Sequence, residues 1–404
     1  MAPAGSFESL HAAIQGGANS IYFGVEQLNM RTKSTHNFIL DDLSEIVRIC
    51  KENRLKSYLT LNTILYDHDI ALMKRIVDVS KETGVSAVIA SDHAVMNYAK
   101  KIGQPVHIST QCNITNIDSV EFYANFADVM VLSRELSLLQ VESINKEIKR
   151  REIIGPSGNL VQTEIFGHGA LCMAVSGKCY LSLHSNFSSA NRGACVQNCR
   201  KSYIVTDKDT GNELEVDNEY IMSAKDLCTI DFLNKIIESG VSVLKIEGRG
   251  RSADYVNITT SCYREAINSI QEGSYSSEKV TVWKERLATV FNRGFWDGYY
   301  LGKLMGEWND SYGSKATTRK VYVAKGRKYY EEAKVGEFLM EAQDLKMGDK
   351  ICITGPTTGV IFTKIEELRI DNKPVIQVKK GTEFTFVVPE KIRPSDKLYK
   401  IVEA

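Results

Sequence analysis

Four cysteines that fall within 28 positions are the residues of this sequence best suited to do chemistry. Cys172, Cys179, Cys195 and Cys199 are separated by 6, 15 and 3 residues. Thiolates are the preferred ligands of iron–sulfur clusters and of structural zinc. Zinc ligands usually come in closer Cys-x₂₋₄-Cys pairs, and the first pair here is wider. The spacing therefore favours a [4Fe–4S] cluster, the alternative being that some of these cysteines are small buried core residues.

Positive charge lies next to the cysteines. Arg192 precedes Cys195, and Arg200 and Lys201 follow Cys199. Such charges lower the pKa of nearby thiols and offset the charge of a cluster. They could equally contact a phosphate or a carboxylate of a substrate, or be solvated surface residues.

The elements that would position these residues alternate along the first 270 residues between short apolar runs and amphipathic stretches. This βα rhythm predicts an α/β fold, most simply a TIM-like (β/α) barrel, in which residues after the strand ends form the catalytic face. Single polar residues there could instead cap helices. Predicted strands are Ser20–Gly24, Lys56–Asn62, Ala87–Ala90, Val106–Ser109, Val129–Leu132, Gln162–Phe166, Ile221–Ala224 and Val243–Ile246. Predicted helices are Asp41–Asn53, Ile70–Thr83, Ser119–Asn125, Leu138–Lys149, Leu227–Ser239 and Ala253–Gln271.

Two segments interrupt this rhythm. Residues 167–202 form a long Cys-rich insertion, which at that length is typical of a functional loop, and a hairpin is predicted over 203–216. Residues 309–318 are a polar linker. We therefore expect a first domain over 1–308 and a small antiparallel β-barrel domain over 319–404, because that region has only short strand-like runs.

Composition excludes several classes of protein. The 404 residues include 50 basic and 50 acidic side chains, with 43% hydrophobic residues, which are ordinary globular values. A formal net charge of zero argues against a protein that coats nucleic acid without specificity. There is no apolar run long enough to span a membrane and no signal-peptide pattern. We expect a cytoplasmic protein with reduced thiols.

Several motifs resemble those of the collagenase-like peptidase family U32, and the resemblance covers essentially the whole chain. The most specific block runs from Glu164 to Arg200 and contains the four cysteines. Shorter matches are Ala2–Gly5, Ala18–Gly24, Ser109–Gln111, Ser223–Leu227, Lys245–Arg249 and Phe291–Phe295.

This resemblance implies oxygen-independent hydroxylation rather than proteolysis. Family members of known role act on the wobble uridine of tRNA with prephenate as the apparent oxygen donor, on a cytidine of ribosomal RNA, or on ubiquinone precursors, and hold an iron–sulfur cluster. Chain length and the Cys-x₃-Cys pair are closest to the tRNA branch, which implies Cys199 as fourth ligand. Cys228 is the alternative, because one branch takes its fourth ligand further downstream. Implied partners are tRNA, a small dicarboxylate donor and iron–sulfur assembly proteins.

The remaining polar candidates fit that reaction. His168, Glu247 and Lys245 are candidate catalytic residues for proton transfer, although Lys245 and Glu247 could simply pair with each other. Arginines bind carboxylates with paired hydrogen bonds, and a tyrosine can stack on a base, although a lone tyrosine more often packs in a core. Candidate substrate-binding residues are Arg192, Arg249, Arg251, Gln111 and Tyr180.

Two other functions stay open. A peptidase would need a nucleophile such as a cysteine paired with His168, yet the sequence has neither a Gly-x-Ser-x-Gly elbow nor a His-Glu-x-x-His zinc motif. A non-enzymatic subunit that carries a cluster for a partner is the other possibility.

Overall fold

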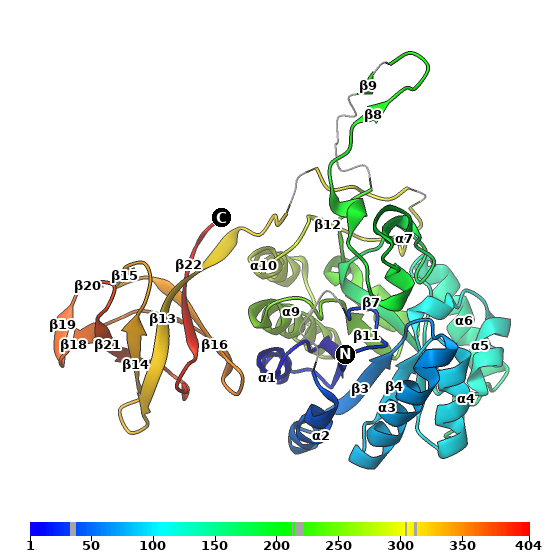
Figure 1. The fold of residues 1–404 in the computed structure, drawn as a ribbon, viewed down its shortest axis with the longest axis horizontal. Helices are drawn as coiled ribbons and strands as arrows, with labels where there is room; N and C mark the ends of the chain where they lie inside the picture. The colour runs from blue at the N-terminus through cyan, green and yellow to red at the C-terminus, as the bar shows by residue number, and fades with distance from the viewer. Residues whose placement is uncertain (33–37, 212, 215–221, 304, 311–312) are drawn as a thin grey trace.

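The computed structural model describes residues 1–32, 38–211, 213–214, 222–303, 305–310 and 313–404. Its larger part is a parallel sheet with helices outside it, and its smaller part is a separate antiparallel sheet (Figure 1). This mixed α/β architecture with a second, all-β unit confirms the expected fold class at that level.

Eight strands of the large sheet run parallel, in the order β1 to β7 and then β11. They are β1 (Ala2–Pro3), β2 (Ser20–Phe23), β3 (Lys56–Leu61), β4 (Ala87–Ala90), β5 (Val106–Ile108), β6 (Val129–Val131), β7 (Gln162–Ala170) and β11 (Val243–Ile246). The strands are short and apolar because both of their faces are covered; all four residues of β2 and of β4 are buried.

The longer helices predicted from the sequence bury one apolar stripe each. In α2 the buried residues include Leu43, Ile46, Val47 and Cys50. The helices are α1 (Phe7–Gln15), α2 (Leu43–Glu52), α3 (Ile70–Thr83), α4 (His93–Ile102), α5 (Ile117–Ala124), α6 (Leu138–Arg150), α7 (Leu181–Asn186), α8 (Leu233–Glu238), α9 (Ala253–Gln271) and α10 (Ser277–Ala288). None of the helices in the described residues is both long and apolar enough to cross a bilayer.

The two ends of the parallel strand series lie next to each other. The Met1 amine donates a hydrogen bond to the Leu244 carbonyl at 2.8 Å, and the Ile246 amide donates to the Met1 carbonyl at 3.0 Å. Strand pairing between β1 and β11 is not formed within the described residues, so closure into a (β/α) barrel stays a prediction.

The region after the insertion differs from its prediction. The prediction of a strand at Ile221–Ala224 is wrong for residues 222–224, and Ile221 lies outside the described residues. The strand in this region is instead β10 (Asp226–Cys228). β10 runs antiparallel to the end of β7, so the next helix, α8, begins at Leu233 rather than Leu227. A local apolar run cannot reveal that pairing, since its partner lies more than 50 residues away.

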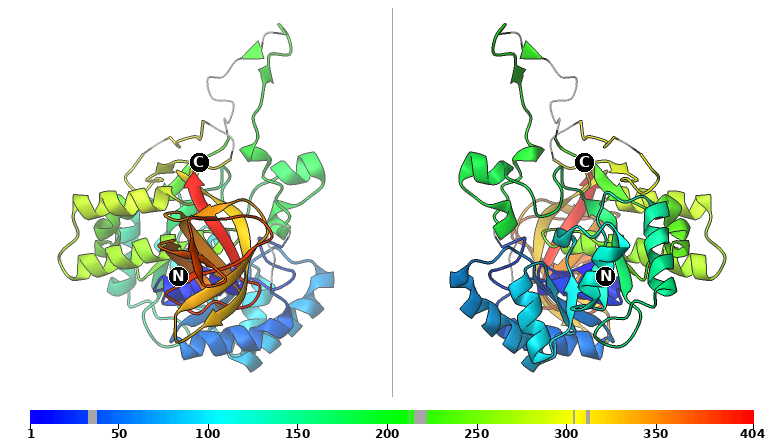
Figure 2. Two further views of the ribbon diagram at one scale, coloured as in Figure 1. Left: turned by 90° about the vertical axis from the view of Figure 1, so that its left-hand side faces the viewer. Right: turned by 90° about the vertical axis from the view of Figure 1, so that its right-hand side faces the viewer.

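The insertion itself contains α7 and two short 3-10 helices, η4 (Ala190–Arg192) and η5 (Asn198–Arg200). The predicted hairpin is present as β8 (Val205–Thr206) paired with β9 (Glu213–Leu214). It extends away from the rest of the molecule (Figures 1 and 2).

The C-terminal sheet has the order β17-β16-β22-β13-β14-β21-β18-β19 and packs around its own core, which includes Phe338, Phe384 and Leu398. Its strands are β13 (Thr318–Tyr330), β14 (Val335–Met340), β16 (Lys350–Gly355), β17 (Gly359–Lys364), β18 (Leu368–Ile370), β19 (Lys373–Val375), β21 (Glu383–Val387) and β22 (Lys397–Glu403), with β15 (Leu345–Lys346) and β20 (Gln377–Val378) as a separate pair. The antiparallel β character is as predicted; its closure into a barrel, and the boundaries 1–308, 309–318 and 319–404, stay predictions.

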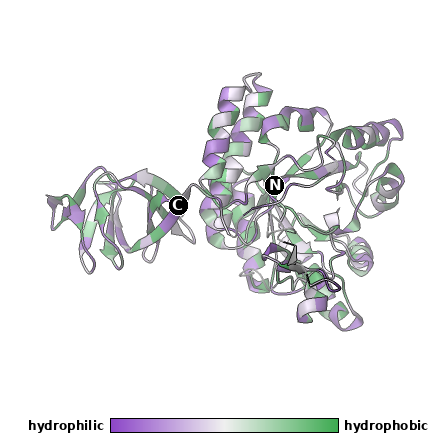
Figure 3. Cartoon of the chain, turned by 90° about the horizontal axis from the view of Figure 1, so that it is seen from above, coloured by the Kyte–Doolittle hydropathy of each residue, from purple (hydrophilic) through white to green (hydrophobic). Residues whose placement is uncertain are grey.

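This sheet rests against the first helix of the α/β part. The Gln15 side chain donates to the Thr358 carbonyl at 3.0 Å and accepts from the Val360 amide at 2.9 Å. Lys320 forms an ion pair with Asp254 of α9 at 2.5 Å. Figure 3 shows apolar and polar residues alternating along the strands of this sheet, as expected when one face of a sheet packs on a core.

Candidate active site

A cavity of about 650 Å³ lies at the carboxyl ends of the parallel strands. Its walls include Tyr22 of β2, Asn62 after β3, Gln111 after β5, Arg134 after β6 and Glu247 after β11. The Cys-rich insertion forms another wall. Residues at this edge of a parallel sheet come from many separate strands, which is why it is the usual place for a ligand site.

All four predicted cluster ligands line this cavity. Burial raises the pKa of the Cys199 thiol; the Arg200 charge acts in the opposite direction, and Cys172, Cys195 and Cys179 add to the rise. Cys172, Cys179 and Cys195 therefore lie within electrostatic range of Cys199.

Cys228, the alternative fourth ligand, does not line the cavity. It is buried on β10, where its Sγ accepts a hydrogen bond from Tyr263 at 3.8 Å, and burial raises its thiol pKa to about 11. Geometry thus groups Cys199, rather than Cys228, with Cys172, Cys179 and Cys195.

The four thiols are not gathered around a single point. Among the described residues, no group of three or more His, Cys, Asp or Glu side chains is close enough to hold one metal ion. A [4Fe–4S] cluster takes one thiolate per iron, so its ligands surround a volume rather than a point. Four thiols on the wall of one cavity fit that requirement.

The cavity wall is strongly cationic although the chain as a whole carries no net charge. Glu247 is the one acidic residue among the described residues that line it. The cationic residues on the wall are Arg31, Arg134, Lys178, Arg200, Lys245, Arg249, Arg251 and Arg293. A concave surface with one sign of charge concentrates ligands of the opposite sign, so this cavity is suited to an anion.

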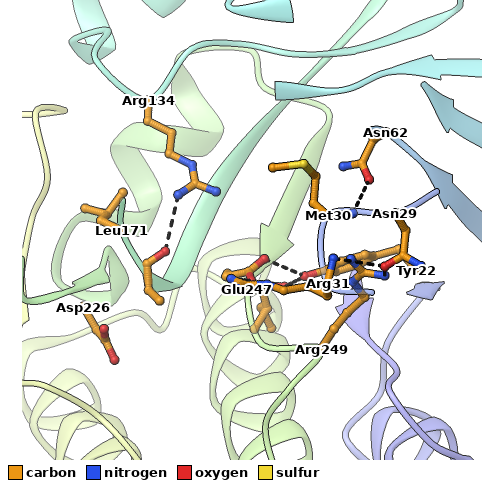
Figure 4. Close-up of polar contacts among 12 residues, drawn as sticks. Tyr22, Asn29, Met30, Arg31, Asn62, Arg134, Leu171, Asp226, Glu247 and Arg249 are labelled. Carbon is orange, nitrogen blue, oxygen red and sulfur yellow. Dashed lines mark hydrogen bonds and ion pairs between the residues drawn. The ribbon is translucent and has the colours of Figure 1, made fainter. Parts of the chain in front are cut away.

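Glu247 is held ionised by its arginine neighbours (Figure 4). Its Oε1 lies 2.7 Å from Nη2 of Arg31, and its Oε2 accepts a hydrogen bond from Tyr22 at 3.1 Å. Burial by itself would raise the pKa of Glu247, but the charges of Arg31, Arg134 and Arg249 hold it at about 2. Such a carboxylate keeps its charge at neutral pH and does not act as an acid.

Lys245 does not pair with Glu247, which was the alternative raised by the sequence. Its Nζ lies 2.8 Å from Oε1 of Glu164, and both side chains are almost fully buried. The ammonium also lies 4.6 Å from the centre of the Tyr22 ring. Lys245 thus presents a fixed positive charge on the cavity wall.

Arg249 is the most deeply buried arginine of this wall, with 5% of its surface exposed. Its Nη1 donates to Asn29 at 3.1 Å and to Thr60 at 2.8 Å, and it has no carboxylate partner within the described part of the chain. Burial lowers the pKa of Arg249 to about 10, so the group still carries its charge at neutral pH.

The other predicted ligand-binding residues of the wall are arranged differently. Arg251 stacks on Phe291, with its guanidinium carbon 3.6 Å from the ring centre. Gln111 accepts a hydrogen bond from Asn62 at 3.2 Å. Tyr180 is 70% exposed at the cavity edge.

Two predicted site residues do not line the cavity. His168 is buried among Tyr255, Tyr263 and Phe295, and burial lowers its pKa to about 3, so the ring stays neutral. Arg192 instead forms an ion pair with Asp69 at 2.7 Å and so attaches the insertion to the segment that follows β3.

Four arginines of the wall were not among the predicted substrate-binding residues: Arg31, Arg134, Arg200 and Arg293. Arg134 donates to the Ala170 carbonyl at 3.3 Å, apart from the Arg31 cluster (Figure 4). Arg200 donates to the carbonyls of Leu171 and Ala224. The sequence could have indicated Arg134, because it comes just after a predicted strand, and Arg200, because it is next to Cys199. It offered no such signal for Arg31, which lies in a segment without a motif.

With this site in view, the chain can be compared with known proteins. It belongs to peptidase family U32: the model of that family matches residues 5–310. A Porphyromonas gingivalis protein named collagenase is 56% identical over 400 residues, covering 99% of this chain and 97% of that protein.

Other relatives are named for RNA hydroxylation. A tRNA hydroxylation protein of Bacillus subtilis is 29% identical over 421 residues, covering 99% of this chain and 94% of its own. A 23S rRNA 5-hydroxycytidine synthase of Escherichia coli is 32% identical over 276 residues, which are 67% of this chain and 39% of that protein. These findings confirm the family resemblance.

Proposed function

We propose that this protein is an iron–sulfur-dependent RNA hydroxylation enzyme that modifies C5 of the tRNA wobble uridine, with prephenate as co-substrate. The observation that carries the proposal is the meeting of four thiols and eight cationic side chains on the wall of one cavity. Thiols of this number suit a [4Fe–4S] cluster, and the cations suit a dicarboxylate. The RNA hydroxylation names of the relatives support the substrate class.

The residues of the chain would bind and orient the reactants. Cys172, Cys179, Cys195 and Cys199 would hold the cluster, which when bound supplies redox chemistry that side chains lack. Arg249 is the natural partner for a donor carboxylate, because its charge is buried and, although Glu247 lies within electrostatic range, it forms no direct ion pair in the described chain.

The remaining charges of the wall would keep the donor oriented. Arg31 is neutralised by Glu247, and Lys245 by Glu164, so these pairs shape the wall more than they attract an anion. Arg251, stacked on Phe291 and without an ion pair in the described residues, is placed to hold a second carboxylate.

A peptidase is the second candidate, favoured by the 56% identity to a protein named collagenase. The site gives it little support. Among the described residues, no hydrogen bond joins a histidine side chain to a cysteine or serine side chain; the ring of His168 contacts the Tyr263 hydroxyl at 3.3 Å instead. Nucleophilic catalysis by Cys or Ser requires such a pairing with a base.

One experiment separates these functions. The protein is produced in bacteria that lack their own tRNA hydroxylation genes, and the nucleosides of tRNA and ribosomal RNA are analysed by mass spectrometry. We expect 5-hydroxyuridine-type nucleosides in tRNA with the wild type, their loss with Cys172→Ala, and their retention with Cys262→Ala, a buried cysteine of α9.

Formation of hydroxycytidine in ribosomal RNA, with no change in the nucleosides of tRNA, would instead identify ribosomal RNA as the substrate. The peptidase would be established by a different result: neither hydroxylated nucleoside is formed, and the purified protein cleaves gelatin. This cleavage should persist in Cys172→Ala.

A further inference from the structure

A small aromatic cleft adjoins the candidate active site. Trp296, Tyr299 and Trp308 line it, so two of the three tryptophans of the chain meet here. The cleft and the main cavity share the wall residues Arg134, Leu171, Cys172, Met173, Ala174 and Ser176. The aromatic rings therefore lie directly beside one of the predicted cluster ligands.

The first two rings are held by their neighbours. Trp296 and Tyr299 pack edge to face with 5.3 Å between ring centres, and the Trp296 indole N–H donates to the Lys225 carbonyl at 3.1 Å. Trp296 is buried, whereas Tyr299 is half-buried. Trp296 thus supports a second ring that remains accessible.

Backbone hydrogen bonds of both chain neighbours of Trp308 fix the position of its main chain. The Lys225 amide donates to the Glu307 carbonyl at 3.0 Å, and the Asn309 amide donates to the Ser223 carbonyl at 2.7 Å. Trp308 forms a bridge with Ala224 between these two bonds. The backbone of Trp308 is therefore fixed, and its indole is half-buried.

We propose that this cleft is a stacking subsite for an unpaired RNA base next to the base that enters the main cavity. Every base has a π-face that stacks on aromatic rings, and tryptophan offers the largest such surface. The cleft itself encloses only about 30 Å³, the space of about one water molecule, so a base would stack on the half-buried rings of Tyr299 and Trp308 at its mouth and not enter it. Two charged side chains line the cleft, Arg134 and Glu135, and Lys178 lies on the wall of the adjoining main cavity.

This assignment rests on the proposed RNA substrate and adds a position for it. The target base would occupy the 650 Å³ cavity beside the thiols, and its neighbour would lie on Trp308 and Tyr299. Stacking of this kind tolerates different bases, so the subsite would contribute affinity and placement more than sequence choice.

The test uses the full-length protein and a fluorescent anticodon stem–loop RNA. Stacking on one aromatic ring predicts that Trp308→Ala weakens RNA binding about tenfold. Trp308→Phe, which keeps a ring, should restore affinity to within about threefold. Phe122→Ala removes an aromatic side chain that is 54% exposed on α5 and should leave affinity unchanged. Binding of prephenate, followed by thermal shift, should be the same in all three variants.

A second measurement needs no variant. An RNA carrying 4-thiouridine beside the target position should crosslink, on irradiation of the wild type, to the peptide that contains residues 296–308. The stacking subsite would be overturned if Trp308→Ala bound and hydroxylated RNA as well as the wild type does. It would also be overturned if the RNA crosslinked only to peptides outside residues 296–308. Either result would leave the proposed function unaffected. A wild-type protein that hydroxylates no RNA would instead overturn the proposed function.

Discussion

Arg31 and Glu247, which are 216 residues apart in the sequence, form an ion pair on the wall of the cavity, with 2.7 Å between Nη2 and Oε1. The pair joins the segment after β2 to the segment after β11. It also leaves Lys245, two residues before Glu247, to pair with Glu164. Because Glu247 is thereby kept ionised, its role in this wall is electrostatic and structural.

Replacing this carboxylate tests that role. We expect Glu247→Gln to lower the free energy of unfolding at pH 7 by about 2 kcal/mol, because it removes the charged half of a partly buried ion pair. The folded-state pKa of Glu247 is about 2, below the ordinary value for glutamate, so its stabilising contribution is present above that ordinary value and is lost as pH falls towards 2.

Urea denaturation at pH 7, 5 and 3 would measure the effect. The difference between wild type and Glu247→Gln should be equal at pH 7 and 5 and smaller at pH 3. A difference that is independent of pH over the whole range would contradict the ion pair as its source.

The cysteine variants give the most direct test of the cofactor. Alanine at Cys172, Cys179, Cys195 or Cys199 should remove most of the iron and the brown absorbance of anaerobically purified protein, because each thiolate binds one iron. Cys228→Ala should keep both, since Cys228 lies outside the cavity. Iron analysis and visible spectra supply the measurement. Loss of the cluster in Cys228→Ala with retention in Cys199→Ala would reverse the ligand assignment.

Removing the buried charge of Arg249 should affect the donor and not the RNA. Charged hydrogen bonds contribute about 1.5–3 kcal/mol, so Arg249→Gln should raise the KM for prephenate about tenfold or more. The affinity for tRNA should change little, because Arg249 is too deeply buried to reach the RNA backbone. Arg48→Gln, on the exposed face of α2, is the matched control. An unchanged KM would remove Arg249 from the donor site.

Basic residues of β13, which opens the C-terminal sheet, are predicted to contact tRNA phosphates. Lys320 is not available for this, because it pairs with Asp254, whereas Arg327 and Lys328 are exposed. Substituting both by Gln should weaken tRNA binding and reduce the slope of log K against log salt by about 1.4. Binding isotherms at several salt concentrations measure this slope, with Lys146→Gln on α6 as control. An unaltered slope would place the RNA elsewhere.

Much of this architecture follows from local sequence patterns. The periodic apolar residues of α2, α3 and α9 define these helices because one turn repeats every 3.6 residues whatever the partner. The spacing of the four cysteines, likewise, pointed to one site, and they do share one cavity. These features depend on residues close together in the chain.

Only the tertiary structure decided which charges meet and which side chains reach the cavity. Lys245 pairs with Glu164 across 81 positions and Arg192 with Asp69 across 123, and nothing local to either residue favours these partners over nearer ones. Nothing in the sequence separated His168 from Glu247, yet Tyr263 of α9 and Phe295 of β12 (Phe295–Trp296) cover the ring of His168. Pairing and burial depend on how distant strands and helices pack together, which spacing along the chain does not encode.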